Sequence, residues 1–143
     1  MFHTLASQIG LAITVLICAF TAWAGGRPQK VAATIVIVAW VSSNLIQDRS
    51  FRHPQYLTLV LDIGLTVLFV ALAVKWRQLW LSGMATFQLL TTASHFAMIL
   101  DSRIFAKASI TAYLIWSYLV LVCLLWGGVA GLLDRRRPGP SGP

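Results

Sequence analysis

The sequence predicts an all-α integral membrane protein, a helical bundle with about five transmembrane helices. Of its 143 residues, 58% are hydrophobic and only 10% are charged, whereas about a quarter of the residues in a soluble domain are charged. The few charges fall in short clusters that separate long apolar runs. This pattern is typical of a chain that crosses a lipid bilayer several times.

The first apolar run covers residues 5–24, about the 20 residues that a spanning helix needs. A signal peptide cleaved after Ala24 is the alternative, but no Lys or Arg precedes the apolar core, which is longer than that of a typical signal peptide. We interpret one stripe of this run as a face against which another helix packs closely. Its small residues recur at every fourth position: Ala6, Gly10, Thr14, Cys18 and Ala22.

The later runs are each bounded by a polar or proline-containing turn, and they cover residues 28–47, 56–74, 79–100 and 104–133. The last run is longer than an untilted span requires, so it should tilt or protrude. Gly127 and Gly131 form a GxxxG pair near its end, although Gly128 beside them favours local flexibility instead. The bundle should therefore occupy residues 1–134, and residues 135–143 form a basic, Pro/Gly-rich tail that we expect to be disordered.

The charges predict how the chain is oriented. Five spans place the termini on opposite sides, and seven Lys and Arg fall on the side of the C-terminus: Arg27, Lys30, Lys75, Arg77, Arg135, Arg136 and Arg137. The other side carries four: Arg49, Arg52, Arg103 and Lys107. This excess favours a cytoplasmic C-terminus. It also explains the net charge of +7, and no basic stripe with interleaved aromatics indicates a nucleic-acid partner.

Polar residues inside the predicted spans form a candidate ligand site toward the outer side. Asp62 in the third span and His95 in the fourth lie at similar depths on helices joined by a tight turn, so we expect them to be neighbours. Gln88 shares a helix face with His95. The complete predicted set is Asn44, Asp62, Gln88, His95, Tyr113 and Trp116.

Other roles for these residues stay open. For Asp62 and His95, interhelical hydrogen bonding that only holds the bundle together is the favoured interpretation, and ligand binding or proton handling is the alternative. A metal or haem site is a third alternative, because His3, His53 and His95 all fall on the outer side. Two of these histidines lack any fixed spacing, however, so we predict no metal ligands.

The tryptophans and cysteines have simpler interpretations. Four tryptophans fall toward the cytoplasmic ends of the spans, where an interfacial belt is expected: Trp23, Trp76, Trp80 and Trp126. Trp40 and Trp116 lie deeper and are placed to line a pocket. Cys18 and Cys123 both lie in apolar runs, where free cysteines behave as small hydrophobic residues.

Part of the chain, about residues 27–120, resembles small uncharacterised inner-membrane proteins of alphaproteobacteria. The resemblance rests on the segments RPQKVAATIVIVAW, WRQLWLSGMATFQLLTTASHFAMILD and AYLIWSYLVLV. In that group the fourth span has a similar Trp entry, a Phe-Gln-Leu-Leu core and a His before an Asp, which match Leu79-Trp80, residues 87–90, His95 and Asp101 here. The resemblance implies a bacterial inner-membrane location and draws attention to Gln88, His95 and Trp116, but it implies no activity.

Motifs for common chemistries are missing from the sequence, which has no P-loop, HExxH or GxSxG. We therefore predict no catalytic residues and no cofactor. The small-residue stripe and the short loops favour a non-enzymatic accessory or scaffold subunit that packs against other membrane proteins or itself. The alternative is a binder of a lipophilic small molecule, such as a quinone, lipid or haem-like compound, in the outer half of the bundle. A channel or transporter is less favoured, because the inner half lacks polar residues.

Overall fold

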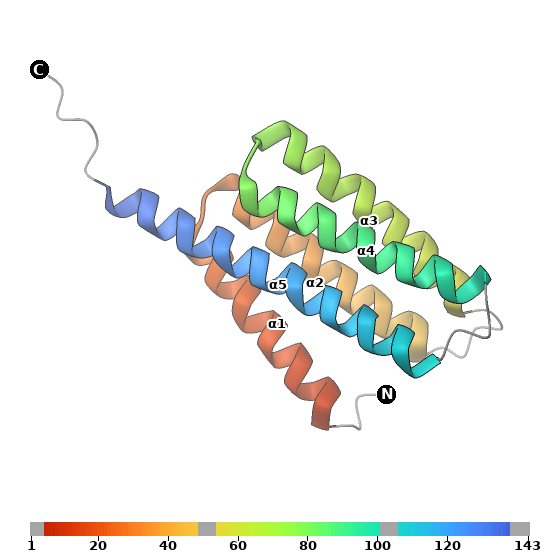
Figure 1. Cartoon of the computed structure of the whole chain (residues 1–143). Coiled ribbons are helices and arrows are strands. Elements are labelled where there is room, and N and C mark those ends of the chain that lie inside the picture. Colours follow the sequence, from red (N-terminus) through yellow and green to blue (C-terminus); the bar gives the residue numbers. More distant parts are fainter. Residues whose placement is uncertain (1–4, 49–53, 101–105, 138–143) are drawn as a thin grey trace, which may run out of the picture.

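The structure of the chain, a computed structural model, describes residues 5–48, 54–100 and 106–137. These residues form five α-helices, α1 (Leu5–Ala24), α2 (Arg27–Asp48), α3 (Pro54–Trp76), α4 (Leu79–Leu100) and α5 (Ala106–Arg136), as Figure 1 shows. The predicted all-α class with five helices is confirmed. Each helix agrees with one predicted span to within three residues at either end.

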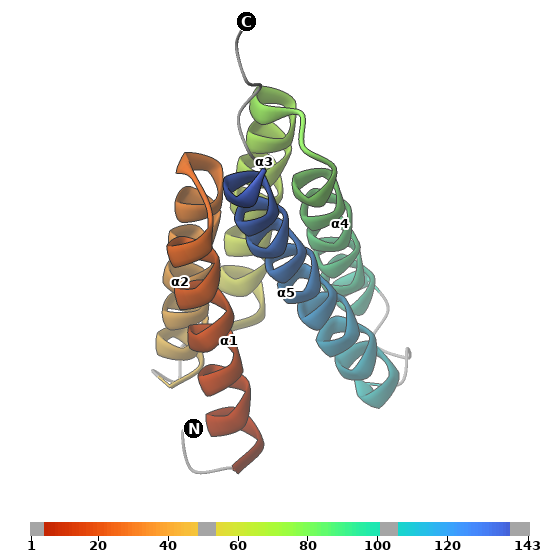
Figure 2. The same cartoon turned by 90° about the vertical axis from the view of Figure 1, so that its left-hand side faces the viewer.

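The helices form a ring in which each packs against the next one along the chain (Figures 1 and 2). Successive helices are antiparallel, and α4 makes the most extensive contacts, with α3 on one side and α5 on the other. The ring closes where α5 packs against α1, and these two helices run parallel to each other. Helix α5 also touches α2 across the ring.

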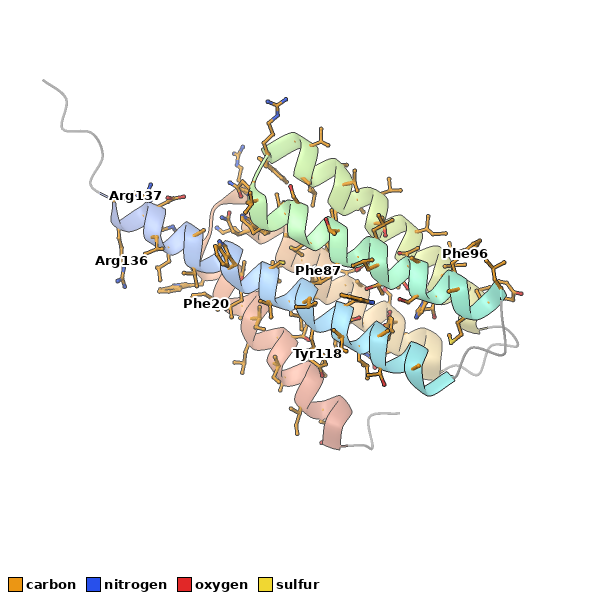
Figure 3. All side chains as sticks on the ribbon, viewed as in Figure 1. Phe20, Phe87, Phe96, Tyr118, Arg136 and Arg137 are labelled. Atoms are coloured by element: carbon orange, nitrogen blue, oxygen red, sulfur yellow. The ribbon has the colours of Figure 1, made fainter. Side chains whose placement is uncertain are left out.

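Two helical segments among the described residues are long and apolar enough to cross a membrane, Tyr56–Trp76 of α3 and Thr111–Arg136 of α5. Residues Gln8–Ala24 of α1 form a shorter apolar segment. Large apolar side chains point outward from all five helices, as the sticks in Figure 3 show. Those more than three-fifths exposed include Leu16, Trp23, Val60, Val67, Val74, Leu79, Leu100 and Trp126.

One half of the bundle is packed through glycines, and we call it the glycine-packed half. It is defined by Gly25, Gly83, Gly127, Gly128 and Gly131, each of which leaves no room for a Cβ atom. A Cβ on Gly131 would lie 2.9 Å from the Cα atom of Gly25, and one on Gly128 would lie 2.9 Å from Thr21 Oγ1. Helices α1 and α5 therefore touch backbone to backbone.

Gly127, Gly128 and Gly131, where the sequence favoured local flexibility, lie in close contacts between helices. Gly127 faces the ring of Trp80 on α4, while Gly128 and Gly131 face α1. The adjacent residues Gly127 and Gly128 therefore contact two different helices, because consecutive helical residues point about 100° apart. Trp80 is only 6% exposed and packs in the core, so its predicted place in an interfacial belt is wrong. Trp23 and Trp126, at 70% and 67% exposed, do face outward.

The small-residue stripe of α1 is confirmed as a packing face where it is described. Thr14 and Cys18 are fully buried, and Gly10 is buried between aromatic residues of α2 and α5. The neighbours of the stripe are helices of this same chain. The described part of this stripe is therefore covered within the chain.

The basic residues that the sequence assigns to one side lie at one end of the bundle. Arg135 donates from its guanidinium to two carbonyl oxygens at the end of α1, Trp23 O at 3.2 Å and Gly25 O at 2.9 Å. A cation is favourable there because unpaired carbonyls give a helix C-terminus partial negative charge. Arg136 and Arg137 project from the free end of α5 (Figure 3). His3, His53, Arg49, Arg52, Arg103 and residues 138–143 lie outside the described residues.

Candidate functional site

A cavity of about 330 Å³ lies between the helices in the other half of the bundle, which we call the cavity half. All five helices contribute to its lining, α1 through Gly10 alone. A volume near 300 Å³ is at the lower end of those found for small-molecule sites. The lining residues are Gly10, Val36, Ala39, Trp40, Ser43, Asn44, Asp62, Leu65, Phe69, Gln88, Thr91, Tyr113, Leu114, Ser117, Tyr118, Val120 and Leu121.

Asp62 is the centre of the polar contacts in this cavity. It lies on α3, is only 5% exposed, and receives a hydrogen bond at its Oδ1 atom from Gln88 Nε2 on α4 at 3.1 Å. Its Oδ2 atom lies 2.8 Å from Nδ1 of His95, about two turns after Gln88 on α4. The predicted proximity of Asp62 and His95 is therefore confirmed.

The two oxygen atoms of the Asp62 carboxylate differ in the hydrogen bonds that they receive. Oδ2 is buried and receives no hydrogen bond of regular geometry from any described residue. His95 meets it at ion-pair distance without an aligned N–H group. A buried carboxylate oxygen is costly to leave without a donor, so this atom is the least satisfied polar group of the site.

Tyr113 connects this polar group to α5. Its ring stacks on that of His95, with 4.6 Å between the ring centroids and 19° between the ring planes. One turn further along α5, Ser117 donates a hydrogen bond to the carbonyl oxygen of Tyr113 at 2.9 Å. The Asp62 carboxylate, the His95 imidazole and the Tyr113 phenol therefore form one contiguous group across α3, α4 and α5.

Most hydroxyl groups near the site are satisfied within their own helices. Each donates to the carbonyl oxygen four residues earlier, as Thr91 does to Phe87 O at 2.9 Å and Ser94 to Leu90 O at 2.9 Å. Thr66 on α3 and Thr92 on α4 also share a hydrogen bond of 2.8 Å between their hydroxyls. Local back-bonding is the usual way to satisfy Ser and Thr inside helices. These hydroxyls therefore contribute little free hydrogen-bonding capacity to the cavity.

Aromatic rings form much of the remaining wall, and Gly10 on α1 keeps the space between two of them. A Cβ at Gly10 would lie 3.3 Å from Cη2 of Trp40 and 3.4 Å from the hydroxyl of Tyr118. Tyr118 extends from α5 toward α1, as Figure 3 shows. Phe69, only 1% exposed, lies at the boundary with the hydrophobic core.

The structure places the six predicted site residues in three positions. Four of them line the cavity: Asn44, Asp62, Gln88 and Tyr113. His95 is not part of the lining and lies behind Asp62 and Tyr113. Trp116 stacks on Phe87, with 6.2 Å between the ring centroids, and does not line this cavity. Trp116 lies three residues from Tyr113 on α5 and points toward a different part of α4.

Sequence reasoning missed several wall residues, among them Ser43, Ser117 and Tyr118. Trp40 was expected to line a pocket but was not included in the predicted set. Trp40 and Asn44 are one helical turn apart, and Asn44 donates to the carbonyl oxygen of Trp40 at 2.8 Å. That spacing was the available signal, since a residue one turn from a site residue shares its helix face.

The described residues contain no group of three or more His, Cys, Asp or Glu that could hold a metal ion. Asp62 and His95 form only a pair. Cys18 and Cys123 are free thiols, Cys18 buried and Cys123 half-buried. Cys123 lies against Gly83, on the α4–α5 contact.

No protein-family model, no curated protein and no solved structure matches this chain. The resemblance to alphaproteobacterial membrane proteins therefore stays a prediction from the sequence.

Proposed function

We propose that this chain is a five-span protein of the bacterial inner membrane that binds a lipophilic small molecule in its central cavity. The observation that carries the proposal is a cavity with mostly apolar walls into which a buried carboxylate and a few amides and hydroxyls converge. This combination is characteristic of small-molecule sites, where apolar walls give affinity and a few polar groups fix orientation.

The exposed apolar surface supports a membrane location. Leu79 is 86% exposed, Leu100 72% and Val74 70%, and such surface over a whole bundle is stable only where lipid or protein covers it. Helices α1, α2 and α4 have 20 to 22 residues and pack alongside α3 and α5, which contain the two described segments that are long and apolar enough to cross a membrane. A helix of about 20 residues reaches across the hydrocarbon core, so we assign all five as spans.

The basic end of the bundle supports an orientation with the C-terminus in the cytoplasm. A fusion of alkaline phosphatase to the C-terminus should therefore be inactive, because this enzyme matures only in the periplasm. An insertion of the same reporter within residues 49–53 should be active. The reverse pattern would overturn the orientation, and activity at both sites would overturn the five-span arrangement.

An accessory or scaffold subunit is the second candidate. The extensive apolar surface is compatible with subunits as well as lipid. The stripe of α1 no longer supports this candidate, because helices of this chain already cover it. The cavity is a more specific feature, and it gives the small-molecule proposal priority.

A pair of adjacent serines on α2 tests the proposed function. Ser43 lines the cavity, whereas Ser42 does not, and both are half-buried. Ser43→Phe should fill the cavity, and Ser42→Phe is its matched control. After mild purification, native mass spectrometry should detect a small molecule on the unmodified protein and on Ser42→Phe but not on Ser43→Phe. Equal retention by all three, or co-purification of only a protein partner, would contradict the proposal.

A further inference from the structure

The described residues that line the cavity include an acidic side chain but no basic one. Among the described residues that line it, Asp62 is the only Asp or Glu, and none is Lys, Arg or His. Helices α1 and α2 contribute only neutral side chains, and the titratable groups against Asp62 are His95 from α4 and Tyr113 from α5. A tyrosine phenol is neutral near pH 7, and histidine is positive only when protonated. An ionised Asp62 therefore gives the cavity a negative potential that no fixed cation in its lining offsets.

The hydrogen-bonding pattern favours a ligand that donates to Asp62. Gln88 already gives its amide N–H to Oδ1, while Oδ2 has no aligned donor among the described residues. An ionised carboxylate only accepts hydrogen bonds. An ammonium group matches it in both charge and donor capacity, and such a pair offsets part of the cost of burying the carboxylate.

The aromatic walls also match a cation. Trp40 lines the cavity from α2, Phe69 from α3 and Tyr118 from α5. The faces of aromatic rings attract cations, Trp most strongly, and the attraction grows when the cation is desolvated. An anionic ligand would meet the opposite preferences, because both the carboxylate and the ring faces repel it.

We propose that the ligand of this cavity is a lipophilic cation, a protonated amine with an apolar body, and that Asp62 is its counter-ion. The proposal rests on the proposed small-molecule function and specifies its ligand class. The ammonium group lies at Asp62 in competition with His95, and the apolar body lies among the aromatic walls.

Three probes that share one apolar body and differ in charge test the ligand class: phenylbutylamine, phenylbutanol and phenylvalerate. Their affinities for the purified full-length protein in detergent are measured by calorimetry near neutral pH, with Ser43→Phe as the correction for partition into the micelle. We expect the amine to bind about tenfold more tightly than the alcohol and the carboxylate more weakly than both. In Asp62→Asn the preference for the amine over the alcohol should disappear.

The outcomes separate the two proposals. If the alcohol binds as tightly as the amine and Ser43→Phe abolishes both, the cavity binds small molecules but the cation proposal is overturned. If Ser43→Phe does not reduce the binding of any probe, the proposed small-molecule function is overturned as well. Should Asp62→Asn not fold, the order of the three affinities in the unmodified protein still decides, since equal affinities contradict a carboxylate counter-ion.

Discussion

The two halves of the bundle contain similar polar residues but satisfy them in different ways. In the glycine-packed half, Gln29 is 6% exposed and uses both ends of its amide on the backbone. Its Oε1 accepts from Gly26 N at 3.0 Å, and its Nε2 donates to Gly127 O at 3.4 Å. In the cavity half, Gln88 is 7% exposed and donates to the side chain of Asp62.

This difference separates a structural polar group from one that is available to a ligand. Backbone atoms of Gly26 and Gly127 cannot leave without moving a helix, so Gln29 fastens α2 to α5 and to the α1–α2 turn. The partners of Gln88 and Asp62 are side chains beside an open volume, which can reorient when a ligand enters. Burial alone would not distinguish the two glutamines; the identity of their partners does.

The largest loss of stability should come from a bulky side chain at a glycine where two helices are in contact. Gly131→Leu places a side chain 2.9 Å from the Cα of Gly25, so α1 and α5 must separate, and we expect a loss of about 2–3 kcal/mol in unfolding free energy. Gly64→Leu is the matched control, because Gly64 is exposed and nothing lies within 4 Å of its Cβ position. Thermal unfolding in detergent measures both. Equal stability of the two variants would show that the glycine-packed half is loose.

The next effect concerns Asp62 and His95, which the structure places 2.8 Å apart. Asp62→Asn and His95→Gln should each destabilise the protein, and the double variant should cost less than the sum by about 1 kcal/mol. Both an ion pair and a hydrogen-bonded neutral pair give this coupling. Thr86→Ala, at an exposed position of α4, should be additive with Asp62→Asn. Additivity of the Asp62–His95 cycle would mean that the two residues act independently.

A smaller effect is expected at Gly10, where the cavity half has its own glycine. The atoms near a Cβ there belong to the side chains of Trp40 and Tyr118, at 3.3 and 3.4 Å, which can rotate where a backbone cannot. Gly10→Leu should therefore cost only about 1 kcal/mol, less than Gly131→Leu, while reducing the cavity. Ala12→Leu, at an exposed position of α1, should leave thermal stability unchanged. A loss at Gly10 as large as that at Gly131 would remove the distinction between the two halves.

The smallest effect should be a gain in stability at the turn between α3 and α4. Arg77 has a φ of 50° and donates from its backbone N to Ala73 O at 2.8 Å, which ends α3 in a left-handed residue. Arg77→Gly should raise the unfolding free energy by about 0.5 kcal/mol, because glycine adopts this conformation without strain. Lys75→Gly removes the same charge from inside the helix and should destabilise instead. A stability loss in both variants would indicate that the charge matters more than the backbone.

The five helices were predictable because long apolar runs and the turns between them set helix length directly. The Asp62–His95 contact was predictable because antiparallel helices joined by a short turn bring equal depths together. Which side chains point into the bundle and which point outward was harder to predict from the sequence. Helices that are apolar on all sides give little periodic signal, so the inward position of Trp80 and the outward turn of Trp116 from the cavity depend on how each helix is rotated.

The glycines near the end of α5 show the same limit. The spacing of Gly127 and Gly131 suggested one contact face, yet the structure uses Gly128 with Gly131 toward α1 and Gly127 toward α4. Only the positions of both neighbouring helices determine that division. The cavity wall was similarly out of reach for residues such as Ser43 and Tyr118, since five separate helices must meet before the wall exists.

The closure of the ring between α1 and α5 affects how the protein is made. Gly10 in the first helix and Tyr118 in the last form opposite sides of one narrow space, and Arg135 fastens the end of α5 to the end of α1. The ribosome therefore makes the α1 side of the pocket before the other described helices and the α5 side last. If all five helices span a membrane, as proposed, Asp62 and Gln88 enter the bilayer before α5 lies beside them, and the nascent protein holds their polar groups in lipid without the finished pocket.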